Sequence, residues 1–109
     1  MRYTMTHRWG NDTQTDIVNA EQLEALLAEL NDTDDIEHPD VSIRDNETGW
    51  SLGIFAGDSG LVVLEVVEDD DDIWHMRGLS PQRILKLCTA FVSGAVDLVR
   101  QESWLPGYQ

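Results

Sequence analysis

The chain has 109 residues, and its 21 acidic residues against 7 basic ones give a formal net charge of −14 at pH 7. Phosphate contacts need clustered Lys and Arg, so this balance argues against binding to DNA, RNA or an anionic membrane surface, and no apolar run is long enough to span a bilayer. The length and the ordinary share of hydrophobic residues, 41%, predict one globular domain over residues 1–109 with a single core.

The first predicted elements are a strand and a helix. Residues 3–9 alternate apolar or aromatic side chains with shorter polar ones, which predicts a strand, and residues 10–15 have turn composition. Asn19 is a good N-cap, with Gln22 at the capping-box position, so a helix is predicted over residues 19–30. Its apolar stripe consists of Leu23, Leu26, Leu27 and Leu30.

Three strands are predicted in the middle of the chain. Residues 32–40 are acidic and interrupted by Pro39, which indicates a loop. Residues 41–44 and 50–54 alternate, and residues 61–67 form a short apolar run rich in β-branched side chains, as in a central strand. Turn residues separate these strands, so they are predicted to form an antiparallel meander.

The last third predicts a loop, a short strand and a helix. Residues 68–72 are five consecutive acids, residues 73–76 suit a short strand, and Ser80-Pro81 marks a helix start. The helix is expected over residues 81–100, with Ser93-Gly94 as a position where it can divide, and the tail at 104–108 is expected to pack back onto the domain. The predicted fold class is α+β, an antiparallel sheet of about four to five strands with two main helices on one face.

No catalytic or metal-binding set is found in the sequence. Gly57-Asp58-Ser59-Gly60 matches the tetrapeptide around a serine-protease nucleophile, but a hairpin turn explains it better at this length. The histidines His7, His38 and His75 have no ligand spacing, and His75 is expected to be a partly buried structural residue. Cys88 lies on the apolar helix face and is expected to be a small buried hydrophobe. We therefore expect no enzyme activity, no cofactor and no metal.

Two acidic clusters are the candidate binding residues. The run at residues 68–72 lacks the alternation and the central Gly of an EF-hand calcium loop, so it is interpreted either as a solvated loop or as a recognition surface for a basic partner. Trp74 beside it supplies an aromatic anchor. The candidate partner-binding residues are Glu68, Asp69, Asp70, Asp71, Asp72 and Trp74, together with Asp34 and Asp35 from the other acidic segment.

The segment from Asn19 to Val67 resembles the Imm1 family of bacterial immunity proteins. The similar features are the capped Leu-rich helix, residues 41–43, the stretch Gly49-Trp50-Ser51-Leu52-Gly53-Ile54, and residues 60–64; the similarity stops after Val67. The resemblance implies a small cytoplasmic protein that neutralises a cognate toxin domain in a polymorphic toxin system. A single cysteine, which excludes an internal disulfide framework, agrees with a reducing cytoplasm. The expected partner is a basic protein toxin, to which a strongly acidic protein would be drawn.

Two other interpretations remain open. The excess of Asp and the single Lys, Lys86, also fit an acidic binding or adaptor domain adapted to high salt, whose folding would weaken at low salt. A small-molecule-binding or enzymatic domain would instead need a pocket between the sheet and the last helix, lined by convergent polar residues.

Overall fold

The computed structural model describes residues 1–31, 40–55, 60–66 and 69–107, with only the backbone of residues 31 and 69–72. These residues form an α+β fold, with one seven-stranded sheet in which all neighbouring strands are antiparallel. The strand order is β2-β1-β3-β4-β5-β6-β7. The strands are β1 (Tyr3–Thr6), β2 (Asp12–Thr15), β3 (Asp40–Asp45), β4 (Trp50–Phe55), β5 (Val62–Val66), β6 (Asp69–Met76) and β7 (Leu105–Pro106). The helices are α1 (Ala20–Ala28), the 3₁₀ helix η1 (Glu29–Asn31), α2 (Pro81–Val92) and α3 (Val96–Arg100).

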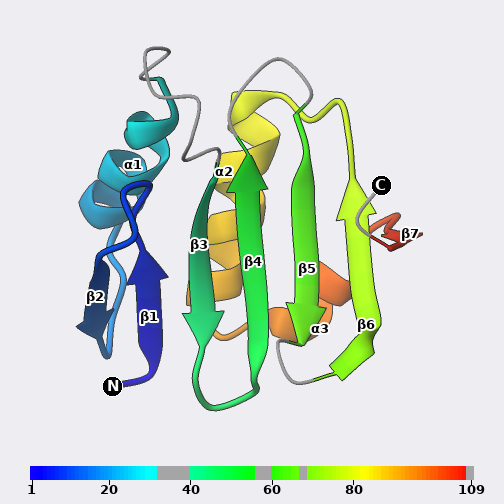
Figure 1. Ribbon diagram of the computed structural model, residues 1–109, viewed down its shortest axis with the longest axis horizontal. Helices are drawn as coiled ribbons and strands as arrows, with labels where there is room; N and C mark the ends of the chain where they lie inside the picture. Colours follow the sequence, from blue (N-terminus) through cyan, green and yellow to red (C-terminus); the bar gives the residue numbers. More distant parts are fainter. Residues whose placement is uncertain (32–39, 56–59, 67–68, 108–109) are drawn as a thin grey trace.

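The helices cover one face of the sheet. Figure 1 shows α2 and α3 behind the strands, and α1 packs against α2. Leu23 and Leu26 of α1 join Leu87, Cys88 and Phe91 of α2 in one buried core with the helix-facing side chains of the strands. This arrangement agrees with the predicted placement of both main helices on the same face.

The helix starts follow the capping chemistry that the sequence predicts. The Asn19 side chain accepts from the Gln22 backbone N–H at 2.8 Å, and the Gln22 side chain accepts from the Asn19 N–H at 3.0 Å. The Ser80 hydroxyl caps α2 by accepting from the Arg83 N–H at 3.2 Å, with Pro81 at the first helical position. Both sets satisfy backbone donors that a helix start otherwise leaves unpaired.

The predicted numbers of strands and helices were too low. Residues 12–15 were expected to form a turn, but they are strand β2, because their backbone pairs with the edge of β1. Their sequence has no alternating apolar side chains that would have predicted a strand. The tail adds β7, which pairs with β6 through Trp74 and His75. Residues 81–100 divide into α2 and α3 around Gly94, whose φ of +86° lies outside the helical region.

The acidic run is not the loop that its composition suggests. Asp69–Asp72 are the first half of β6, because β5 offers them a backbone to pair with. Glu65 pairs with Ile73 while the next residue, Val66, pairs with Asp69, so Asp70, Asp71 and Asp72 bulge out of register. Figure 1 shows this bent start of β6 at the same end of the sheet as α3.

Candidate functional site

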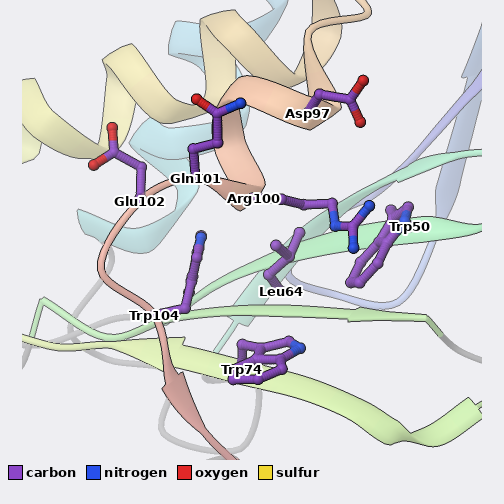
Figure 2. A pocket seen from close by; sticks show the side chains of 8 residues that line it. All are labelled: Trp50, Leu64, Trp74, Asp97, Arg100, Gln101, Glu102 and Trp104. Atoms are coloured by element: carbon purple, nitrogen blue, oxygen red, sulfur yellow. The ribbon is translucent and has the colours of Figure 1, made fainter.

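A pocket of about 520 Å³ opens between the sheet and α3. This volume lies within the range of small-ligand and side-chain pockets, roughly 300–1,000 Å³. Three indoles and one leucine form its apolar part, and polar residues of the helical segment form the rest (Figure 2). Its lining residues are Trp50, Leu64, Trp74, Asp97, Arg100, Gln101, Glu102 and Trp104.

The strand register brings the sheet residues of the pocket together. Leu64 of β5 pairs with Trp74 of β6, and Trp50 pairs with Val66, so these side chains share the helix-covered face. Leu64 is buried and forms the floor, whereas the two indoles are half-buried at its sides. The pocket therefore lies over three neighbouring strands, β4, β5 and β6.

The C-terminal tail closes the third side of the pocket. Pro106 of β7 pairs with Trp74, which brings the preceding segment against β6. The Trp104 indole N–H donates to the Val99 carbonyl at 2.7 Å, so the ring is held against α3. Because a buried indole needs a partner for its N–H, this hydrogen bond fixes the orientation of Trp104 at the pocket wall.

The charged side chains at the pocket differ in their contacts. The Arg100 guanidinium lies 4.8 Å from the centre of the Trp50 ring, within cation–π distance. The Arg83 guanidinium donates to the Glu102 carboxylate at 2.6 Å. Asp97, one turn before Arg100 on α3, is exposed. The pocket therefore has aromatic walls and a rim that carries both acidic and basic side chains. One of the basic side chains, Arg100, already lies against the Trp50 ring.

The structure brings only part of the predicted binding set to this pocket. Trp74 lines it, and the backbone of Asp69–Asp72 leads into Trp74 along β6. Glu68, Asp34 and Asp35 lie outside the described residues, as do His38 and most of the Gly57–Gly60 turn. From the second acidic segment, Asp40 is described at the start of β3, where burial and, to a lesser extent, the charge of Glu65 raise the pKa of its carboxyl group.

The sequence analysis placed a pocket between the sheet and the last helix only under the small-molecule interpretation, and it missed most of the residues that line the pocket found there. It singled out neither Trp50 nor Arg100 as binding residues, and it treated Trp104 only as part of a tail that packs back. The available signal was the presence of four tryptophans in a chain of 109 residues, three of which meet here. Spacing could not reveal the meeting, because the three come from β4, β6 and the tail.

A hydrogen-bonded group of catalytic residue types lies elsewhere. The His7 ring contacts the Glu29 carboxylate at 2.7 Å through Nδ1 and the Thr13 hydroxyl at 2.6 Å through Nε2. Glu29 also accepts from the Arg8 backbone N–H at 2.9 Å. None of these residues lines the pocket described above, and the contacts tie the β1–β2 hairpin to η1. We interpret these hydrogen bonds as structural contacts that hold the β1–β2 hairpin against η1.

The other sites considered in the sequence have structural roles or find no support. His75 is buried, and its Nδ1 lies 2.9 Å from the Gly107 carbonyl, which agrees with a structural histidine. Cys88 is fully buried on α2, and burial raises the pKa of its thiol to about 12, so it remains a neutral thiol at neutral pH. Among the described residues, no three His, Cys, Asp or Glu side chains gather as metal ligands.

Two further findings concern the molecule beyond the pocket. Within the described ranges, no helix is both long and apolar enough to cross a membrane. No protein-family model matches the sequence, and neither the curated proteins nor the solved structures contain a match. The function must therefore be argued from the pocket and the charge around it.

Proposed function

We propose that the protein is a non-catalytic inhibitor that binds a basic protein toxin in the cytoplasm and neutralises it, as an immunity protein does. The observation that carries this proposal is the continuity of β6, in which a bulge of aspartates is followed, after Ile73, by a tryptophan that lines the aromatic pocket. The proposed contact surface consists of the start of β6 and the tryptophan pocket. Asp34, Asp35 and Glu68 are proposed as secondary contacts.

Charge supports the choice of a basic partner. The chain carries −14 at pH 7, and the acids at the start of β6 have no basic neighbour in the sequence between Glu65 and His75. Such a surface attracts a basic protein over distances near the Debye length and raises the association rate. The acidic surface also repels nucleic acid. If the toxin is a nuclease or another nucleic-acid-binding protein, the inhibitor would compete with nucleic acid for the same basic surface of the toxin.

The aromatic pocket supports a specific complex. Charge steers encounter, but affinity in protein interfaces is concentrated in a few aromatic or Arg side chains that fill well-packed pockets. Trp74 is half-buried, rests on the core and faces the pocket, so it presents an indole that is already held in place. A partner side chain entering the pocket would bury Trp74 fully at little entropic cost to this protein.

Binding kinetics test the proposal, with the protein domain encoded by the neighbouring upstream reading frame as the proposed partner; the proposal expects that domain to be a basic toxin. Asp70→Lys with Asp71→Lys should slow association by about tenfold or more at low salt. The matched control, Glu21→Lys with Glu24→Lys, makes the same charge change on the exposed side of α1 and should slow it far less. Trp74→Ala should instead speed dissociation by about thirtyfold, which corresponds to about 2 kcal/mol.

Two results would contradict the proposal. If the upstream domain does not bind, or if both charge-reversed pairs slow association equally, the acidic start of β6 is not the contact surface. If the protein binds nothing but unfolds at low salt, its acidity reflects salt adaptation, the interpretation that the sequence left open.

A further inference from the structure

We propose that the tryptophan pocket is an arginine receptor, in which a guanidinium group of the partner lies against Trp74 and Trp104 beside the Arg100–Trp50 pair. This inference rests on the proposed function, because it names the partner side chain that enters the pocket. It is nevertheless tested on the isolated protein with small probes, independently of any toxin.

The protein's own Arg100 shows what the pocket accommodates. Its guanidinium lies over Trp50 at 4.8 Å, which is the distance of a favourable contact between a cation and an aromatic face. The planar guanidinium is more weakly hydrated than the Lys ammonium, so it loses less solvation when it enters an aromatic pocket. Trp74 and Trp104 are the two other indoles of the lining, and the volume of about 520 Å³ leaves room for a second side chain beside Arg100.

The rim provides the counter-charge for an entering cation. Asp97 is exposed and Glu102 is half-buried on the helical side of the pocket, across from Trp74 (Figure 2). Glu102 is already paired with Arg83, so the exposed Asp97 carboxylate is the main counter-charge that the lining offers. The net charge of −14 adds a negative potential, which favours a cation over an anion even though Arg100 is among the lining residues.

Arg100 is the residue that limits the affinity of this pocket for a guanidinium group. It occupies the face of Trp50 and repels a second guanidinium, so the free pocket binds arginine more weakly than its three indoles allow. Replacing Arg100 with Met, an unbranched and uncharged side chain, removes the repulsion and frees the Trp50 face. Arg100→Met should therefore tighten arginine binding, whereas an anion site built on Arg100 would be abolished by the same change.

The test is an NMR titration of the tryptophan indole N–H signals with N-acetyl-arginine amide and, as its uncharged isostere, N-acetyl-citrulline amide. The arginine probe should shift the Trp74 and Trp104 signals, with the citrulline probe binding at least about tenfold more weakly. Trp74→Leu should weaken the arginine probe by about tenfold. The control Trp9→Leu should leave it unchanged, because Trp9 is 52% exposed next to β1, four strands away from β6.

Several results would overturn the inference. Equal binding of the arginine and citrulline probes, or tighter binding of N-acetyl-leucine amide, means an apolar pocket. Binding of N-acetyl-glutamate amide that is lost in Arg100→Met means an anion site. If the arginine probe fails but the toxin domain still binds in a Trp74-dependent way, only this inference is wrong. If the arginine probe binds and the toxin domain does not, the proposed function is wrong.

Discussion

The contact between Gly60 and the segment that starts α2 gives the sharpest prediction about stability. Gly60 has a φ of +57°, in the left-handed region. A Cβ added there would lie 2.4 Å from the Leu79 backbone nitrogen and 2.6 Å from the Leu79 oxygen. The Leu79 N–H also donates to the Gly60 carbonyl at 3.3 Å, so the clash strikes a hydrogen-bonded backbone junction just before the Ser80 cap.

The size of the effect follows from two separate terms. The left-handed conformation costs a residue with a Cβ about 1–2 kcal/mol. Displacing the Leu79 backbone adds a steric term of about 1–3 kcal/mol, typical of overpacking at a site that cannot relax freely. Gly60→Ala should therefore lower the free energy of unfolding by about 2–5 kcal/mol, without any loss of apolar burial.

Gly78 supplies the matched control. Its φ is +70°, but a Cβ there would meet no heavy atom within 4 Å. Gly78→Ala should show the conformational term alone, about 1–2 kcal/mol. Urea denaturation followed by far-ultraviolet circular dichroism measures both variants, with an unchanged m-value as the check on two-state unfolding. Equal losses for the two variants would refute the reasoning, because the close approach to Leu79 would then contribute nothing.

Three further predictions concern the core, the cysteine and the acidic strand. In urea denaturation, Leu26→Ala should lower the free energy of unfolding by about 2–5 kcal/mol, and Leu27→Ala should lower it by clearly less, because Leu26 is buried whereas Leu27 is only partly buried. The reverse order would mean that α1 turns a different face toward the core. The Cys88 thiol should react with a thiol reagent at pH 8 only as fast as the protein unfolds, since burial raises its pKa to about 12; rapid reaction in the native protein would contradict the packing of α2. Asp70→Asn should leave the denaturation midpoint unchanged or slightly higher, by relieving repulsion in the bulge, and a marked loss would indicate that the acids hold a cation.

The sequence predicted best what depends on neighbouring residues. The capping box at Asn19, the Ser80-Pro81 start of α2 and the meander of β3, β4 and β5 all rest on local chemistry, and all are confirmed. The apolar run in β5 is buried as expected, with Val62, Val63 and Leu64 all inaccessible.

What the sequence could not predict depends on pairing between distant segments. Strand β2 has no alternating apolar side chains, and the start of β6 consists of acids, which have low β-propensity. Both segments are nevertheless strands, because the pairing of their backbone with a neighbouring strand outweighs the preference of their side chains. The pocket needs Trp104 to return to Trp74 through β7, a two-residue strand that leaves no pattern in the sequence. Pockets that gather residues from distant segments become visible only once the sheet order is known.

Protection of cells from the toxin is the most direct test of the account. The proposed toxin, the domain encoded by the neighbouring upstream reading frame, is expressed together with this protein carrying Asp70→Lys, Asp71→Lys and Trp74→Ala, after circular dichroism has shown that the variant is folded. The wild-type protein and the control with Glu21→Lys, Glu24→Lys and Trp9→Ala, which carries as many changes on the opposite part of the fold, should both restore growth. The variant at β6 should not. If that variant protects cells as well as the wild-type protein does, the start of β6 and the tryptophan pocket are not the surface that binds the toxin.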